Sequence, residues 1–317
     1  MKKISVIIPC YNEEENILPM YERLKKVFEP LTHYDYEFVY VNNGSTDHSD
    51  RIFHELAGRD KKVVVIFLSR NFYKSQGAFT CGLDFAQGDA AILLDGDLQD
   101  PPEVIPALIK KWEEGHDIVL GERVKRKGSL LRRIAYKFFY RIFKGLSYIN
   151  IPLDVGDFSL LDKKVVSVFK KLPERNRYIR GLRAWVGFKT ASVSYTRDER
   201  LKGITTNSLY NNIEWALFAV FSFSYVPLRI ISILAFLALL LIGLLAVVYT
   251  ALYFMYPELA PRGFQTLFLS IFALGALQLL CFAIISEYLI IMFEEIKGRP
   301  KYIINNILNN SSNKLLT

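Results

Sequence analysis

The sequence has 317 residues and a formal net charge of +8, from 40 Lys and Arg against 32 Asp and Glu. This length allows one large domain or two ordinary ones, and the charge taken alone would suit a nucleic-acid partner. The positions of the cations argue against nucleic acid, because the densest basic segment also carries apolar aromatic side chains. The three cysteines, Cys10, Cys81 and Cys281, lack metal-ligand spacing, which predicts a reduced compartment without disulfides.

Short apolar runs alternate with amphipathic stretches in the first part of the chain. Strands are expected at 4–8, 36–41, 63–68, 90–94 and 117–120, and helices at 13–28, 47–58, 74–86 and 102–114. This alternation predicts an α/β fold with a mostly parallel sheet and helices on both faces. Ligands bind beyond the carboxyl ends of the strands in such sheets. The polar turns that follow the strands are therefore expected along one edge, at 9–13, 42–47, 69–71 and 95–99.

The segment from Ala90 to Asp100 carries the most informative motif. A continuous apolar strand runs into Asp95-Gly96-Asp97, and two prolines then end the segment. Glycine permits a tight turn, so both carboxylates can converge on a hard cation, which prefers oxygen ligands. The alternative is an acidic turn without a ligand, since Asp, Gly and Pro all favour turns.

Two further segments have the composition of helices at a membrane surface. Near 129–147 four cations recur at helical spacing, and aromatic and aliphatic side chains recur on another face. From about 207 to 225 aromatic residues dominate, with Glu214 as a rare charge, and Trp and Tyr favour the headgroup level. The alternatives are an amphipathic helix packed on its own domain for the first segment and a plain helix entering the bilayer for the second. The chain between them, 154–203, is less regular.

Two long uncharged stretches follow, between Arg229 and Glu258 and from Gly263 to Ser286. Each exceeds the roughly 20 residues that span a bilayer. We expect transmembrane helices at about 229–256 and 263–290, with a soluble hairpin as the alternative.

Flanking charges predict the orientation of these helices. Arg229 precedes the first, and Lys297, Arg299 and Lys301 follow the second, so these ends should be cytoplasmic. The first apolar run of the chain is too short for a signal peptide. This divides the chain into a cytoplasmic domain (1–225), a two-helix membrane part (226–293) and a cytoplasmic tail (294–317), with both termini inside.

The turns after the strands form an ordered set of motifs: Pro9-Cys-Tyr-Asn-Glu13, 41–47 and Asp95-Gly-Asp-Leu-Gln99. In this set the chain resembles family 2 glycosyltransferases, whose A-type nucleotide-sugar fold is Rossmann-like. Further motifs lie at 154–158, 173–176, 185–187, 221–229 and 294–300. In these the chain resembles the polyprenyl-phosphate glycosyltransferases, of the bactoprenol glucosyltransferase and dolichol-phosphate mannose synthase type. The resemblance covers nearly the whole chain.

The resemblance implies a nucleotide-sugar donor bound with Mg²⁺ or Mn²⁺. Asp97 would hold the metal, with Asp95 and Gln99 as further ligands, and the metal would act as a Lewis acid on the departing diphosphate. The donor-binding residues that it implies are Pro9, Tyr11, Glu13, Asn43, Ser45, Arg70, Asp95 and Arg123. For Arg70 and Arg123 an ordinary surface position is the alternative.

The implied acceptor is a polyprenyl phosphate, which is anionic at neutral pH and needs no strong base. The resemblance implies three catalytic residues, Asp157, Asp97 and Asp95. Asp157 is carried over as the catalytic carboxylate, which accepts a residual proton or stabilises positive charge on the sugar ring. A structural acid is the alternative for Asp157. Arg200 and Lys202 would position the lipid phosphate. Single displacement inverts the anomeric centre, and the loop at 195–206 is expected to order over the donor.

Four positions depart from the usual pattern of these relatives. An aspartate is usual at Asn43, a glycine at Tyr73, an arginine at Ser159 and a lysine at Thr206. Asparagine can still accept a hydrogen bond from a base, although without the charge. With two cations missing on the acceptor side, Arg200, Lys202 and the basic helix would carry more of the lipid phosphate's charge.

The expected function is therefore inverting transfer of a hexose, glucose from UDP-glucose, to undecaprenyl phosphate at the cytoplasmic face of the inner membrane. A GDP-mannose-dependent mannose synthase is the alternative within the enzyme class, and a non-catalytic nucleotide-binding scaffold is the alternative outside it. A processive synthase would need more spans and a Gln-x-x-Arg-Trp motif. Besides the bilayer, the expected partners are further copies of the chain, a tetramer being one such assembly, and a separate flippase, because two spans do not easily form a flipping path.

Overall fold

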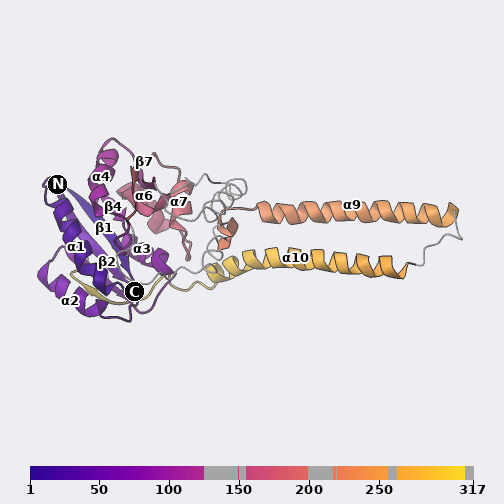
Figure 1. The fold of residues 1–317 in the computed structure, drawn as a ribbon, viewed down its shortest axis with the longest axis horizontal. Helices are drawn as coiled ribbons and strands as arrows, with labels where there is room; N and C mark the ends of the chain where they lie inside the picture. The colour runs from indigo at the N-terminus through magenta and orange to yellow at the C-terminus, as the bar shows by residue number, and fades with distance from the viewer. Residues whose placement is uncertain (125–148, 150–154, 199–216, 219, 256–262, 311–317) are drawn as a thin grey trace.

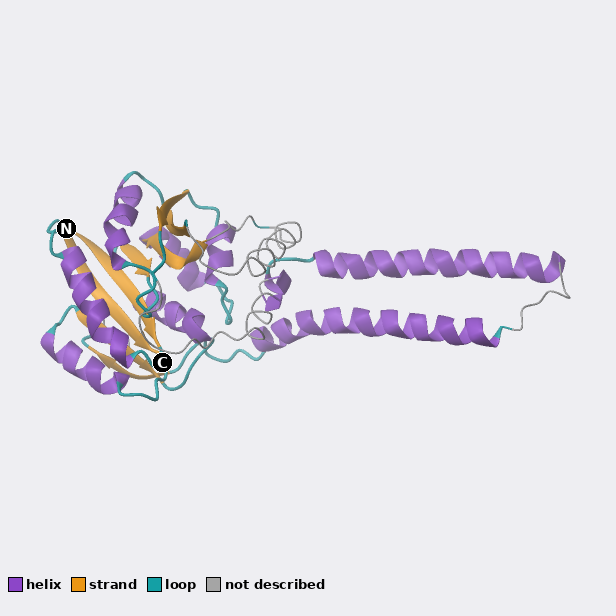
Figure 2. Ribbon diagram, in the orientation of Figure 1, coloured by secondary structure: helices purple, strands orange, loops and turns teal. Residues whose placement is uncertain are grey.

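The computed structural model describes residues 1–124, 149, 155–198, 217–218, 220–255 and 263–310. Figure 1 shows a domain built around one sheet, from which helices α9 (Val226–Met255) and α10 (Phe264–Ile296) extend side by side. Figure 2 shows the sheet enclosed by helices within that domain, and helices alone in the extension.

The sheet has eight strands in the order β7-β5-β6-β4-β1-β2-β3-β8. Their bounds are β1 Lys2–Cys10, β2 Tyr34–Asn42, β3 Val63–Leu68, β4 Ala90–Leu93, β5 Ile118–Arg123, β6 Val155–Asp162, β7 Thr190–Tyr195 and β8 Ile304–Leu308. The four central strands, β3, β2, β1 and β4, run parallel. Strand β6 is antiparallel to β4 and β5, and β8 is antiparallel to β3, while β7 is parallel to β5. The sheet is therefore mixed but mostly parallel in its centre.

The central strands are apolar because helices cover both faces of the sheet. All six residues of β3 are buried. In β1 the side chains of Val6 and Ile8 join one hydrophobic cluster, whereas Ile7 between them joins the other. Alternate side chains of a strand point to opposite faces, so the two clusters are the two helix-covered sides of one sheet.

The helices divide between these two sides. On the first lie α1 (Glu14–Phe28), α2 (Ser49–Arg59), the short η1 (Pro102–Val104) and α4 (Ile105–Glu113). On the second lie α3 (Lys74–Phe85), α6 (Lys163–Lys171) and α7 (Ile179–Trp185). The result is a three-layer α/β/α domain.

The position of β4 in the sheet identifies the edge at which a ligand is expected to bind. The chain builds β1, β2 and β3 outward in one direction and then crosses back to place β4 on the other side of β1. In open α/β sheets ligands bind at such a switch point, outside the carboxyl ends of the strands. The turns that follow β1 and β4 are the ones that meet there.

Helices α9 and α10 are long and apolar enough to cross a membrane, by length and composition. Their candidate spans are Val226–Leu252 and Ser270–Ile296, with mean hydropathies of 3.1 and 2.1. At 1.5 Å per residue the two helices are about 45 and 50 Å long, against about 30 Å for a hydrocarbon core. Large apolar side chains such as Leu244, Val247 and Phe282 are more than half exposed. Contact of such a surface with water is unfavourable, so the exposed side chains of these helices favour an apolar surrounding.

The chain returns from α10 to the sheet. Strand β8 pairs with β3 and closes that edge. Just after it, the Asn309 side chain donates to the carbonyl groups of Ala57, Asp60 and Val63, at the end of α2 and the start of β3. The last described residues of the chain are thus part of the sheet domain.

The expected α/β fold and the strands and helices predicted up to residue 120 are confirmed, with ends that differ by a few residues. The sequence pattern did not indicate β6, β7 or β8. Helix α10 ends at Ile296 rather than near 290. The expected basic helix near 129–147 lies outside the described residues, and of 207–225 the structure describes only the last part, which is helical at 217–218 and 220–222.

Candidate functional site at the carboxyl ends of the strands

The turns after β1 and β2 are hydrogen-bonded to each other. The backbone N–H of Asn12 donates to Ser45 Oγ at 3.0 Å, and the N–H of Thr46 donates to Asn12 Oδ1 at 2.7 Å. Asn12 has a φ of 55°, a left-handed conformation that asparagine tolerates. The next residues are joined in the same way, because the N–H of Glu14 donates to Asp47 Oδ2 at 3.1 Å. The sequence-predicted donor residues of these two turns are thereby brought to one place.

The turn after β2 also lies against the turn after β3. Gly44 has a φ of +73°, and a Cβ there would lie 2.6 Å from the carbonyl carbon of Arg70. Only glycine allows this approach. The Arg70 guanidinium stacks 4.1 Å from the centre of the Phe72 ring and remains exposed, so this predicted donor residue lies at the rim of the edge.

The acidic turn after β4 packs on the end of β1. A Cβ on Gly96 would lie 2.8 Å from the Pro9 carbonyl oxygen and 3.0 Å from Cys10 Sγ. The N–H of Gln99 donates to Asp97 Oδ1 at 3.1 Å, which fixes one carboxylate oxygen of the turn. Asp95 and Asp97 are therefore held at the switch point, as the motif predicted.

Charges around this turn favour a cation. Burial raises the pKa of Asp95 well above its ordinary value, and the negative charges of Asp157, Asp97 and Asp100 raise it further, against the opposing effect of Arg197. A divalent cation would relieve this repulsion, so the residues present fit a metal. Within the described part of the chain no three His, Cys, Asp or Glu side chains are grouped as a metal cage. Mg²⁺ commonly takes one or two carboxylates and completes its shell with water and phosphate oxygens, which suits a paired Asp95 and Asp97.

Asp100 binds the end of β7 and the residues that follow it, and so holds them next to the acidic turn. Its carboxylate is fully buried and accepts hydrogen bonds from Tyr195 Oη at 2.5 Å, Arg123 Nη2 at 3.1 Å and Arg197 Nε at 3.2 Å. Although burial lowers the pKa of Arg123, the Asp100 carboxylate raises it above its ordinary value. Arg197 also lies 3.6 Å from Asp97.

This network gives Arg123 an interior partner. A Cβ on Gly156 would lie 2.5 Å from Arg123 Nη2, so the glycine makes room for the guanidinium. The structure places the sequence-predicted Arg123 beside the acidic turn, in an ion pair with Asp100 rather than on an open surface. The sequence pattern did not single out Asp100 or Arg197, although Asp100 closes the Asp95 motif and so carried a signal.

Asp157 lies on β6 and is paired with a residue of α7. Arg180 donates from Nε to Asp157 Oδ1 at 3.0 Å and from Nη2 to Oδ2 at 2.7 Å. Burial would raise the pKa of Asp157, but Arg180, with further help from Arg183 and Gln76, holds it at about 2. The carboxylate is therefore ionised and fixed in orientation. No sequence pattern pointed to Arg180, because it lies on a helix whose cations have no distinctive spacing.

Arg183 takes up the space beside Ser159. Its guanidinium is buried and donates to Ser159 Oγ at 2.5 Å and to the carbonyl oxygen of Asp157 at 3.0 Å. Burial lowers the pKa of Arg183 to about 10. Helix α7 thus supplies a cation next to Ser159, the position where the resemblance implies an arginine.

Asn43 is engaged by its neighbours along the chain. The side chain is 2% exposed, and its Oδ1 accepts from the N–H of Phe72 at 2.9 Å. Its Nδ2 donates to the Lys74 carbonyl at 2.7 Å and to Asn71 Oδ1 at 3.2 Å. The amide that was expected to meet a base therefore holds the turn at 71–74. Arg200, Lys202 and Thr206 lie outside the described residues.

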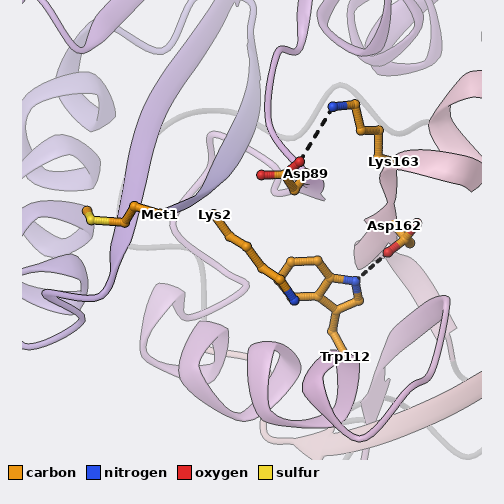
Figure 3. A pocket seen from close by; sticks show the side chains of 6 residues that line it. All are labelled: Met1, Lys2, Asp89, Trp112, Asp162 and Lys163. Atoms are coloured by element: carbon orange, nitrogen blue, oxygen red, sulfur yellow. Dashed lines mark hydrogen bonds and ion pairs between the residues drawn. The ribbon is translucent and has the colours of Figure 1, made fainter.

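A shallow pocket lies at the other edge of the sheet (Figure 3). It is lined by Met1, Lys2, Asp89, Trp112, Asp162 and Lys163. Its polar groups are paired with one another: Trp112 Nε1 donates to Asp162 at 2.7 Å, and Lys163 lies 3.5 Å from Asp89. Because it lies at the amino ends of β1 and β4, away from the acidic turn, it is not the site indicated by the switch point.

The sheet order, the acidic turn at the switch point and the buried Asp157 define an α/β domain of the nucleotide-sugar glycosyltransferase class. The sequence profile of Glycosyl transferase family 2 matches residues 5–169, which run from β1 into α6 and include Asp95, Asp97 and Asp157. The chain belongs to this family.

Curated relatives match over nearly the full length. The chain is 38% identical over 309 residues to an uncharacterized glycosyltransferase of Synechocystis sp., covering 96% of this chain and 95% of the relative. It is 40% identical over 310 residues to a prophage bactoprenol glucosyl transferase homolog of Escherichia coli, covering 96% and 99%. It is 41% identical over 310 residues to the bactoprenol glucosyl transferase of Shigella phage SfII, covering 95% and 97%. The likeness therefore extends beyond the family domain and includes α9 and α10.

Proposed function

We propose that this protein transfers a hexose, glucose from UDP-glucose, to undecaprenyl phosphate or a similar polyprenyl phosphate with inversion at the anomeric carbon. The observation that carries the proposal is the occurrence, in one chain, of an acidic turn at the switch point and two exposed apolar helices. The first suits a metal-bound nucleotide sugar and the second suits an acceptor dissolved in a bilayer. The bactoprenol glucosyl transferases among the relatives supply the glucose and the lipid of the proposal.

The donor would occupy the edge formed by the turns after β1, β2 and β4. Asp97, with Asp95 and Gln99, would hold Mg²⁺ or Mn²⁺, which when bound draws electron density from the departing diphosphate. Tyr11 and Ser45 lie on the turns that would receive the nucleoside, and the rigid packing of Gly96 on Pro9 fixes the carboxylates before the donor arrives. Such preorganisation lowers the cost of stabilising charge in the transition state.

Asp157 would act as an ionised carboxylate rather than as a strong base. Its pKa of about 2 disfavours a protonated form at neutral pH. A phosphate acceptor already carries its negative charge, so its oxygen can attack the anomeric carbon without a proton being removed. An oriented carboxylate can instead stabilise the positive charge that develops on the sugar ring. Arg180 would fix the direction of that carboxylate.

Helices α9 and α10 would span the inner membrane with both termini in the cytoplasm. Cations flank the ends nearest the sheet domain: Arg229 near the start of α9, stacked 4.5 Å from the Tyr225 ring, and Lys297, Arg299 and Lys301 after α10. An excess of such cations marks the cytoplasmic side. The division into 1–225, 226–293 and 294–317 follows from these ends. Two exposed helices per chain also suit association with further copies, and transfer of the product across the membrane would need a separate flippase.

The decisive experiment offers labelled UDP-glucose and GDP-mannose to the purified full chain in vesicles containing undecaprenyl phosphate, with Mg²⁺, Mn²⁺ or EDTA. We expect labelled lipid from UDP-glucose, only with metal, and at least a hundredfold less product from Asp97→Ala and Asp157→Ala. Label from GDP-mannose alone would assign the mannose synthase instead. Nucleotide binding without product from any donor would contradict the proposal and favour the scaffold.

A further inference from the structure

Three motifs that carry the resemblance to relatives have no place in the chemistry described above. They are the motifs at 173–176, 221–229 and 294–300, together with the residues that follow the first and the last, up to 177 and 303. The structure brings all three together where the sheet domain meets α9 and α10. We call this meeting point the junction.

The first contact of the junction joins the end of α10 to the loop at 173–177. The backbone N–H of Arg175 donates to Glu295 Oε1 at 2.9 Å, and the Arg175 guanidinium donates to the carbonyl of Arg299. Lys301 Nζ donates to the Leu172 carbonyl at 2.9 Å. The chain leaving α10 is therefore fastened to the domain within a few residues of the helix end.

The second contact fastens the segment that leads into α9. Phe223 is 6% exposed and packs against Tyr178 with ring centres 6.1 Å apart, over Gly181, where a Cβ would lie 2.4 Å from its ring. On its other side the segment at 221–225 contacts helix α10. Phe221 meets Tyr288 edge to face at 5.0 Å, and Tyr288 Oη donates to the Ser224 carbonyl at 2.7 Å.

Both contacts lead into the candidate site within one or two residues. Gly181, which receives Phe223, follows Arg180, the partner of Asp157. The carbonyl of Ile303 accepts from the N–H of Ser69, where the turn after β3 begins. The residues that attach the helices to the domain are thus close in sequence to Arg180, which orients Asp157. They also contact the turn after β3, at the edge where the donor is proposed to bind.

We propose that the junction is a positioning device, which sets the height and tilt of the site above the bilayer so that a lipid phosphate reaches it. This rests on the proposed transfer to a lipid phosphate. Reacting atoms must lie within about 3.5 Å, and a misplacement of about 1 Å can lower a rate roughly a hundredfold. A domain joined by a loose linker would sample many heights, whereas two separate fastenings restrict it to one.

Glu295 offers a test with matched controls. Glu295→Ala removes the acceptor of the Arg175 N–H, Glu295→Gln keeps an acceptor oxygen, and Glu294→Ala removes only a neighbouring pair with Lys297 in the same helix. Each variant in vesicles is assayed with undecaprenyl phosphate in the bilayer and with a short, water-soluble prenyl phosphate. A soluble acceptor can approach the site at any height, so it reports on the chemistry without the positioning.

For Glu295→Ala we expect kcat/KM to fall roughly tenfold with the bilayer acceptor and to stay within about twofold with the soluble one. Glu295→Gln and Glu294→Ala should match the wild type with both. Phe221→Ala, which removes the contact with Tyr288 outside the domain core, should reproduce the selective loss. An equal loss with both acceptors, or no loss with either, overturns the positioning role. A wild-type chain that glucosylates neither acceptor overturns the proposed function instead.

Discussion

Asn43 and Tyr73, where the resemblance implies an aspartate and a glycine, are linked through one turn. The turn that its amide holds contains Tyr73 and Lys74, with φ values of 48° and 55°. Both values lie in the left-handed region, which costs a non-glycine residue about 1 kcal/mol or more. The hydrogen bond from Asn43 Nδ2 to the Lys74 carbonyl helps to hold this conformation. An aspartate has no N–H to donate, so a turn with Tyr73 favours asparagine at position 43.

Restoring the usual acid at this position should therefore harm the protein. Asn43→Asp replaces a donor by a carboxylate that faces the Lys74 carbonyl, and an unsatisfied buried group costs about 1–3 kcal/mol. We expect the urea midpoint to fall accordingly, and donor affinity to fall with it. Asn305→Asp, an exposed position with the same charge change, should leave both unchanged. If the Asn43→Asp variant were more stable or bound the donor more tightly than the wild type, this would show that residue 43 contacts the nucleotide base.

The Asp157 pair should make part of the stability depend on pH. The pKa of Asp157 is about 2 in the folded chain, below the value of about 4 for a free Asp. A carboxyl group with a lowered pKa contributes its stability fully above about pH 4, and that contribution is lost as the pH falls toward 2.

Asp157→Asn should accordingly lower the free energy of unfolding by about 3 kcal/mol at pH 7, because it removes the buried carboxylate from its ion pair with Arg180. The difference from the wild type should shrink as the pH approaches 2, measured by chemical denaturation at each pH. Asp35→Asn removes an exposed pair with Lys62 and should cost less than about 1 kcal/mol. A difference for Asp157→Asn that stays constant with pH would contradict the ion-pair account.

At the scale of elements, the acidic turn depends on its approach to β1. Gly96→Ala would place a methyl group 2.8 Å from the Pro9 carbonyl, which is backbone and cannot swing aside. We expect Asp95 and Asp97 to shift, with product formation falling roughly tenfold to a hundredfold and the metal concentration for half-maximal rate rising. Gly58→Ala is the control, because a methyl group there meets nothing within 4 Å. Wild-type kinetics in Gly96→Ala would remove the turn from the site.

The elements also show what the sequence could and could not predict. Strands β1 to β4 are apolar runs closed by polar turns, a pattern that indicates strands directly, so the acidic turn could be assigned to the sheet edge. The sequence pattern did not indicate strand β6, because Gly156, Asp157 and Ser159 interrupt its apolar run. Contacts with Arg180 and Arg183 help to satisfy these buried polar groups. Those arginines are more than 20 residues away in sequence from the carboxylate, hydroxyl and carbonyl groups that they contact. Strand β8 has two exposed asparagines and pairs with a strand more than 200 residues earlier, which no local pattern reports.

On the scale of the whole molecule, one domain with charged and polar surfaces carries an extension whose apolar side chains are exposed. Figure 1 shows the N-terminus on the side of the domain away from α9 and α10, and the described part of the chain ends back at the sheet. In the proposed membrane topology, the first and the last described residues therefore lie on the same side of the bilayer as the sheet domain. Our proposal that this side faces the cytoplasm rests on the positive-inside pattern.

This topology can be tested by cysteine labelling in intact cells. Glu258→Cys, between the two helices in sequence, should react with a membrane-impermeant maleimide from outside, whereas Lys62→Cys on the sheet domain should react only after lysis. The native cysteines serve as the background, since Cys10 and Cys81 are buried and Cys281 lies within α10. Labelling of Lys62→Cys in intact cells, with Glu258→Cys protected, would reverse the orientation.

The pairing of β8 with β3 has a consequence for biosynthesis. The ribosome delivers β3 early, but the strand that covers its outer edge is delivered only after both apolar helices have been made. Until then the edge of β3 offers unpaired N–H and C=O groups, which are a template for association with other chains. Chains that stall before α10, or whose helices fail to insert, should therefore be captured by chaperones and proteases. The sheet of a growing chain can therefore be completed only after both apolar helices have been synthesised.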